Sequence, residues 1–187
     1  MIVRDLSLHL LDLVQNSITA GANLITIRIS LDEQKMLTME LIDDGRGMNP
    51  ELLKRVTSPF ATTRTTRKVG LGIPLMKENA EKAGGSFQLE SEEGVGTRLT
   101  VVMDTGNIDC LPLGDLEGTL LSLMLTNPMH PDFLFIGKAP KGSCSFDTRE
   151  VRAALGNDIP FNEPSVAMWL KEALHEEMNP IFGGVLL

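Results

Sequence analysis

Residues 11–22 read LDLVQNSITAGA, and the polar side chains in and just before this stretch decide how the chain is interpreted. The apolar residues around them recur at helical spacing, which predicts a helix over residues 5–20. At about 100° per residue, His9, Asp12 and Asn16 share one face of this helix, opposite the apolar residues. An asparagine oxygen suits Mg²⁺, and a carboxylate one turn earlier could orient or deprotonate a nucleophile. A purely solvated face is the alternative interpretation.

A turn with two glycines, DDGRGM over residues 43–48, follows a predicted apolar strand. Gly45 and Gly47 let the backbone turn sharply and come close to a ligand, and Met48 ends the turn. Asp43 ends the strand, where it can accept a hydrogen bond inside a cleft, such as one from the exocyclic amine of adenine. An ordinary surface loop is the alternative, because Asp-Gly is a common turn pair.

A second glycine segment, GLGIP over residues 70–74, opens the next predicted helix. The stretch before it, residues 61–68, has neither helical nor strand periodicity and carries three cations, Arg64, Arg67 and Lys68. Exposed amides at a helix N-terminus bind phosphate, and glycines permit close approach. The segment is therefore a candidate phosphate site, with a solvated basic loop as the alternative. The sequence has neither the P-loop pattern nor the dinucleotide-binding fingerprint.

The rest of the chain continues as short helices and strands. In chain order, the predicted elements are a helix at 5–20, strands at 24–31 and 36–42, helices at 50–56 and 71–83, strands at 86–90 and 97–103, a helix at 115–125, strands at 133–136 and 143–146, and helices at 149–155 and 164–178. We predict a nucleotide-binding domain over residues 1–105 and a small α/β appendage of unknown role over residues 106–187, which can pack on the first domain. Asn162 can cap the last helix, where Trp169, Leu170 and Leu174 suggest an apolar face that packs on the first domain or on a partner.

The composition argues against several classes of protein. The 17 basic and 25 acidic residues give a net charge of -8, which opposes binding to a nucleic-acid backbone. Two cysteines, Cys110 and Cys144, are too few for a disulfide framework and lack the paired spacing of a zinc site. The N-terminus does not read as a secretory signal, and no apolar run reaches about 18 residues. We therefore expect a cytoplasmic protein that binds neither nucleic acid nor membrane.

Taken in order, these segments resemble the motifs of the GHKL superfamily. This is the ATP-binding fold shared by type II topoisomerases, heat-shock chaperones, histidine kinases and the mismatch-repair protein MutL. Residues 11–22 resemble the N box in its MutL form, and residues 43–48 resemble the first glycine box. Residues 59–64 resemble the histidine-kinase F box, and residues 70–73 the second glycine box. Gly96-Thr97 resembles a Gly-Thr pair that starts a late strand. The resemblance covers roughly residues 6–103, and the ordered set of motifs is far more specific than any one of them.

The resemblance implies a fold and a set of ligands. The fold is α+β, a two-layer α/β sandwich called the Bergerat fold, with helices on one face of a mixed, mainly antiparallel sheet. The ligands are ATP and Mg²⁺, where Asn16 would bind the metal and Asp43 the adenine amine, assisted by Thr97. Asp12 is the candidate catalytic residue. The candidate ATP-binding residues are Asn16, Asp43, Gly45, Gly47, Met48, Thr63, Arg64, Lys68, Gly70, Leu71, Gly72, Ile73 and Thr97.

Three departures from the family pattern concern the chemistry. Asp12 stands where ATPases of the family have the glutamate that activates water, and its shorter side chain predicts slow hydrolysis. Lys68 replaces the first glycine of the kinase-type second box, and Arg64 replaces a lysine of the F box. The segment that borders the phosphates, the ATP lid of the family, is therefore expected to be unusually basic.

Three functions are compatible with these residues. The first is a stand-alone, histidine-kinase-like protein that transfers phosphate to a separate protein, as histidine kinases and anti-sigma-factor serine kinases do. Only about five residues precede the first helix, so we expect no phosphoacceptor helix there, and we expect His9 to be structural or to line the site. The second is a MutL-like, ATP-dependent switch, and the third is an ATP-binding regulator with negligible turnover. The expected partners are ATP, ADP and an unidentified protein, and a homodimer is compatible with each function.

Overall fold

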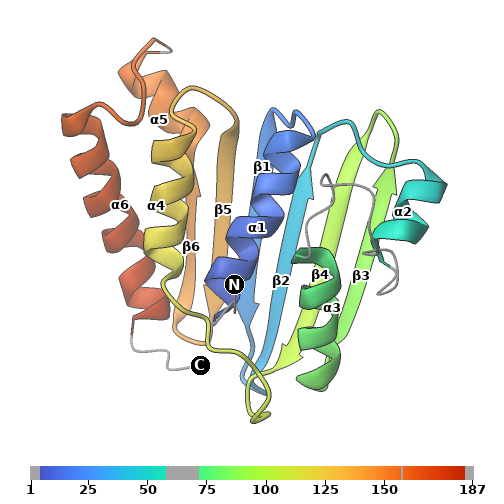
Figure 1. Ribbon diagram of the computed structural model, residues 1–187. Helices are drawn as coiled ribbons and strands as arrows, with labels where there is room; N and C mark the ends of the chain where they lie inside the picture. Colours follow the sequence, from blue (N-terminus) through green and yellow to red (C-terminus); the bar gives the residue numbers. More distant parts are fainter. Residues whose placement is uncertain (1–4, 58–71, 157, 184–187) are drawn as a thin grey trace.

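The computed structural model describes residues 5–57, 72–156 and 158–183. Its strands are β1 (Leu24–Leu31), β2 (Met36–Asp43), β3 (Ser86–Glu92), β4 (Gly96–Asp104), β5 (Asp132–Ala139) and β6 (Gly142–Asp147). Its helices are α1 (Leu6–Thr19), α2 (Pro50–Val56), α3 (Gly72–Lys82), α4 (Leu116–Thr126), α5 (Thr148–Leu155) and α6 (Pro164–Phe182). The strands form one six-stranded mixed sheet in the order β3-β4-β2-β1-β5-β6, and α1, α3, α4 and α6 lie on the same face of it (Figure 1). The expected α+β sandwich is confirmed.

Helix α1 forms as predicted and packs its apolar face on the sheet. The Asp5 side chain accepts the backbone N–H of Leu8 at 2.9 Å, which caps the helix. Leu10 and Val14 are among the apolar side chains that α1 buries, and each such burial stabilises the fold by roughly 1.5–3 kcal/mol. His9 departs from the expected polar face, because α3 packs against that side of α1 and leaves the imidazole only 2 % exposed.

The antiparallel part of the sheet brings distant residues into one row. Strand β2 pairs with β1 on one side and with β4 on the other, and β3 pairs with β4. In this register Ser91 of β3 lies opposite Thr97 of β4, and Thr97 lies opposite Asp43 of β2. Residues that face each other across neighbouring strands point to the same side of a sheet. The predicted adenine residues Asp43 and Thr97 are therefore neighbours.

The C-terminal segment continues the same sheet. Strand β5 runs parallel to β1, with Leu24 opposite Asp132, and β6 runs antiparallel to β5. One cluster of buried apolar residues includes Ile27 of the first segment together with Phe133 and Phe135 of the second. The predicted boundary after residue 105 falls in the connection between β4 and α4, so the two predicted segments share a sheet and a core.

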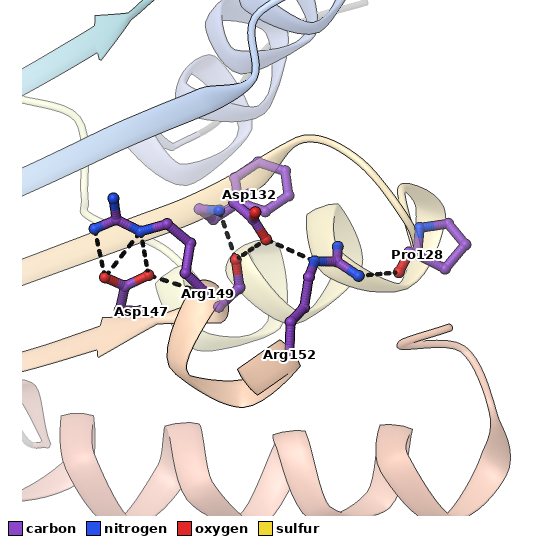
Figure 2. A network of polar contacts seen from close by, with 7 residues as sticks. Pro128, Asp132, Asp147, Arg149 and Arg152 are labelled. Carbon is purple, nitrogen blue, oxygen red and sulfur yellow. Dashed lines mark hydrogen bonds and ion pairs between the residues drawn. The ribbon is translucent and has the colours of Figure 1, made fainter. Parts of the chain in front are cut away.

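A partly buried polar network joins α5 to the start of β5 (Figure 2). The Nε–H of Arg152 donates to Asp132 Oδ1 at 2.7 Å, and its Nη1–H donates to the carbonyl oxygen of Pro128 at 3.3 Å. The hydroxyl of Thr148 donates to the same Asp132 oxygen at 2.9 Å and accepts the N–H of Phe133 at 2.8 Å. The Asp132 carboxylate thus joins β5 to α5, and Arg152 joins the same helix to the loop at Pro128.

The predicted apolar face of α6 is confirmed at Leu170 and Leu174, which are fully buried, but its predicted cap and the place of Trp169 are wrong. Its cap is Glu163 rather than Asn162, because the helix begins at Pro164 and the Glu163 carboxylate accepts the amides of Ser165 and Val166. Trp169 is 49 % exposed although the neighbouring Leu170 is fully buried, because one helical step of about 100° turns Trp169 away from the sheet. No helix in the described part of the chain is both long and apolar enough to cross a membrane.

Candidate functional site

A cavity of about 130 Å³ lies between α1, the glycine turn after β2, and strands β3 and β4. Its walls are mostly apolar, with a few polar groups that converge from different elements, as in most small-molecule sites. The predicted site residues that line it are Asn16, Asp43, Gly47, Met48, Ile73 and Thr97. These residues come from five segments of the chain, and the fold brings them together.

Asp43 is the most firmly held polar group of the cavity. Its side chain belongs to a residue that is only 8 % exposed, at the end of β2. The hydroxyl of Ser17 on α1 donates to Asp43 Oδ2 at 2.6 Å, and the backbone N–H of Gly45 donates to Oδ1 at 2.9 Å. A buried carboxylate needs such donors, and each of its oxygens keeps a lone pair for a further donor. The arrangement fixes a hydrogen-bond acceptor inside an apolar cavity.

The glycine turn is closed onto the hairpin between β3 and β4. Gly47 has a φ of 63°, and a Cβ there would lie 1.9 Å from the carbonyl oxygen of Glu92. Gly96 has a φ of 137°, and a Cβ there would lie 2.0 Å from the carbonyl oxygen of Asp43. A backbone atom cannot move away cheaply, so only glycine fits at either position. These two contacts explain why glycine is needed at both positions.

Asp12 and Asn16 lie one helical turn apart on α1, at different depths. Asn16 is half-buried and lines the cavity, whereas Asp12 is exposed beside it. A Cβ on the buried Gly72, at the start of α3, would be 3.4 Å from the Cβ of Asp12. The second glycine segment therefore approaches α1 at Asp12. The predicted residues Thr63, Arg64, Lys68, Gly70 and Leu71 lie outside the described residues.

Two serines of the site were not predicted. Ser17 lies on the buried face of α1, and Ser91 on β3 contacts both the glycine turn and Thr97. A hydroxyl among buried leucines needs a hydrogen-bond partner, so Ser17 carried a usable signal. Ser91 carried none, because its role depends on the pairing of β3 with β4.

A larger hollow of about 540 Å³ lies on the opposite, helix-free side of β1, β2 and β4, lined in part by Leu24, Ile42 and Val95. We assign the candidate site to the smaller cavity instead. Asp43 and Thr97 line both hollows, but the smaller cavity also contains the Ser17 donor of that carboxylate and Ile73 of the second glycine segment. The larger hollow has exposed charges at its rim, such as Glu90 and Glu92.

His9 links α1 to α3 just below the site. The side-chain nitrogen of Asn79 lies 2.8 Å from His9 Nε2, so a neutral imidazole accepts the amide hydrogen there. Its Nδ1 is buried and has no hydrogen-bond partner in the described part of the chain. Burial lowers the pKa of His9 below its usual value, against the opposing effect of the carboxylates of Asp12 and Asp5. The imidazole is therefore neutral at pH 7.

Acid is expected to destabilise the protein through His9. Because the folded state disfavours the charged imidazole, the unfolded chain binds more protons as the pH falls below about 6.5, the ordinary pKa of histidine. The contribution of the neutral, buried imidazole to stability is therefore complete above about pH 6.5 and is lost as the pH falls below it. Urea unfolding at pH 7 and pH 5 should show a smaller loss of stability in His9→Gln than in the wild type. The exposed His130→Gln is the control, and equal losses in all three proteins would contradict the assignment.

Comparison with known proteins agrees with this geometry. Residues 2–107 match the family model described as histidine kinase-, DNA gyrase B-, and HSP90-like ATPase. The chain is 39% identical over 77 residues to sporulation kinase E of Bacillus subtilis (strain 168), a match that covers 41% of this chain and 10% of that kinase. It is 30% identical over 94 residues to the sensor histidine kinase ZraS of Salmonella typhimurium, covering 49% of this chain and 20% of that kinase.

A solved structure shares the fold. The crystal structure of the N-terminal domain of a DNA repair protein aligns with a TM-score of 0.51 and 16% identity, over 78% of this chain and 52% of that one. The two kinases match over only 10% and 20% of their own length, so their similarity concerns an ATP-binding, kinase-like domain. Because the family model covers residues 2–107, more than half of the 187 residues, the chain belongs to the family of histidine kinase-, DNA gyrase B- and HSP90-like ATPases, the GHKL family that its motifs resemble.

Proposed function

We propose that the protein binds Mg·ATP in the cavity at Asp43 and transfers the γ-phosphate to a separate protein. The observation that carries this proposal is the fixed Asp43 carboxylate, which has donors on both oxygens and opens into an apolar cavity of a GHKL ATPase domain. The carboxylate would accept a hydrogen bond from the exocyclic amine of adenine. The apolar walls would take the base, as they do in most nucleotide sites.

Asn16 is suited to hold Mg²⁺ beside the nucleotide. Its amide offers a neutral oxygen at the rim of the cavity, and Mg²⁺ commonly combines a few protein oxygens with phosphate oxygens and water. No group of three or more His, Cys, Asp or Glu side chains that could hold a metal occurs among the described residues, which fits a metal held mainly by its substrate. When bound, the metal would neutralise charge on the phosphates.

Asp12 is the candidate base for phosphate transfer. It is exposed one helical turn from Asn16 and next to Gly72, so an incoming hydroxyl or imidazole of another protein can reach it. Its carboxylate would orient that group and take its proton. We place Gly72 and the predicted residues Thr63, Arg64, Lys68, Gly70 and Leu71 at the phosphates, as the family resemblance implies. The positive charges of Arg64 and Lys68 would balance the phosphate charge.

Labelled ATP distinguishes phosphate transfer from the alternatives. The protein is incubated with Mg²⁺ and γ-labelled ATP, with and without the purified proteins encoded beside it, and both labelled protein and released ADP are measured. Label on a second protein is the expected result. Release of ADP without labelled protein would contradict the kinase and favour an ATP-dependent switch. ATP binding without either product would favour a regulator with negligible turnover.

Asn16→Ala is expected to abolish the effect of Mg²⁺ on ATP binding. The affinity of the variant in Mg²⁺ should fall by about 10-fold or more, to the value that the wild type shows in EDTA, because losing a metal ligand costs at least as much as losing a group that orients one. Titration with a fluorescent ATP analogue measures this. Gln15→Ala, the exposed neighbour on α1, is the matched control. A Mg²⁺ response that survives in Asn16→Ala would exclude Asn16 as the ligand.

A further inference from the structure

Four apolar side chains remain exposed or partly exposed on the outer surface of the C-terminal helices. Met168 and Trp169, in the first half of α6, are 64 % and 49 % exposed. Leu121 and Leu125 of α4 lie one helical turn apart and are only partly buried. A single exposed apolar residue needs no explanation, but a group of them that includes tryptophan and methionine is typical of interaction sites.

A polar contact between the two helices shows that these side chains are neighbours. His175 Nδ1 of α6 lies 3.1 Å from Glu117 Oε2 near the start of α4. The two helices lie side by side and run in opposite directions (Figure 1). Leu125, two turns further along α4 than Glu117, is therefore level with Met168, about two turns back along α6 from His175. Leu121, Leu125, Met168 and Trp169 thus form one surface, which we call the α4–α6 patch.

Acidic residues extend this patch along α6. Helix α4 contains Glu117 as its single charged residue, and α6 contains one lysine and three glutamates. At about 100° per residue, Glu172 and Glu176 lie on the same exposed face of α6 as Met168 and Trp169. An apolar strip is therefore continued by a negatively charged one.

We propose that the α4–α6 patch binds a basic amphipathic helix of another protein. The apolar side of such a helix would cover Met168 and Trp169, and its lysines or arginines would face Glu172 and Glu176. This assignment follows from charge complementarity, because a negative surface repels the phosphates of a nucleic acid or an anionic membrane. A second copy of the chain fits poorly, since a twofold contact would bring the same acidic face to both sides.

The patch lies apart from the nucleotide site. All four of its residues belong to the segment 106–187, outside residues 2–107 that match the family model, and none of them lines the cavity at Asp43. The proposed partner surface therefore stands or falls independently of the proposed nucleotide site.

A labelled synthetic peptide tests the apolar part of the patch by fluorescence anisotropy with the full chain. The peptide has about 18 residues, since shorter helices are marginal in water, with leucines along one face and lysines elsewhere. Met168→Ser combined with Trp169→Ser should weaken its binding at least about 10-fold, because aromatic anchors dominate such interfaces. Both side chains are exposed, so circular dichroism should show an unchanged fold. Absence of binding to the wild type, or equal binding to this variant, would overturn the inference.

Charge variants distinguish the patch from the general negative charge of the chain. Glu172→Gln combined with Glu176→Gln should weaken peptide binding by about 5-fold. Glu33→Gln combined with Glu93→Gln changes the net charge equally at two exposed turns between strands and should have little effect. Equal losses in the two double variants would reduce the binding to general electrostatic attraction and contradict the inference.

Two further measurements identify the occupant of the patch. Glu172→Lys combined with Glu176→Lys should bind a matched peptide that has glutamate in place of lysine, and the wild type should not. Equal binding of both peptides to the wild type would contradict a charge-selective site. Sedimentation should show that Met168→Ser with Trp169→Ser leaves the oligomeric state unchanged. Conversion of a wild-type dimer into a monomer by this variant would make a second copy the occupant and exclude the proposed helix.

Discussion

Asp43→Asn is expected to weaken ATP binding by roughly 10- to 100-fold, the largest effect of any single substitution in the site. A hydrogen bond to a charged group contributes about 1.5–3 kcal/mol, and about 1.4 kcal/mol corresponds to a tenfold change in affinity. Asparagine has nearly the same shape but replaces one acceptor oxygen with an amide that only donates. In one orientation the amide would face the backbone N–H of Gly45, a donor against a donor. In the other it would face the Ser17 hydroxyl, which would lose its present acceptor and have to accept instead, and in both the cavity has one acceptor fewer for the adenine amine. Isothermal titration with Mg·ATP measures the loss.

The neighbouring carboxylate provides a matched control. Asp44 is exposed, and its Oδ1 accepts the backbone N–H groups of Asn23 at 2.7 Å and Leu24 at 2.9 Å. It therefore supports the start of β1 and contributes no oxygen to the cavity around Asp43. Asp44→Asn should bind ATP as the wild type does. Equal losses of affinity in Asp43→Asn and Asp44→Asn would mean that the turn needs its charge and that Asp43 does not read the base.

Local signals predicted most of the secondary structure. The cap at Asp5, the apolar spacing of the first helix and the glycines at 84–85 that end α3 all act within a few residues, so a sequence pattern reveals them. The pairing of β1 with β5 links residues more than a hundred positions apart, and no local signal specifies it. The predicted appendage and the first domain therefore proved to share one sheet, which the sequence did not indicate.

The residues of the site also fall into those that a local signal reveals and those that depend on distant contacts. Asp43, Gly47 and Asn16 were candidates because their residue types and spacing are unusual, and they do line one cavity. Ser91 could not be found, because its contacts exist only once the hairpin of β3 and β4 has closed on the glycine turn. His9 was assigned to the polar face because one helix viewed alone does not reveal which neighbour will cover it.

Arg152→Met is expected to lower the free energy of unfolding by roughly 2–3 kcal/mol, because it breaks the partly buried network at Asp132. Arg152 is 8 % exposed and donates to Asp132 and Pro128 (Figure 2). Its guanidinium carbon lies 4.0 Å from the centre of the Phe161 ring. Methionine keeps much of the packing but none of the donors. Within the described residues, Nη2 of Arg152 is buried without a hydrogen-bond partner, so the loss of that unpaired group offsets part of the cost. Urea unfolding followed by circular dichroism measures the change.

A second arginine on the same helix is the control that distinguishes loss of this network from loss of a positive charge. Arg149 pairs with Asp147 at 2.6 Å, but its side chain is 51% exposed, so Arg149→Met should have a much smaller effect. Trp169, the single tryptophan, reports on the C-terminal segment, while circular dichroism reports on the whole chain. Because β5 pairs with β1 and the core is continuous, we expect both signals to change at the same urea concentration in Arg152→Met. If only the Trp169 transition moved to lower urea, residues 106–187 would unfold on their own, and the shared sheet would not make the two segments one cooperative unit.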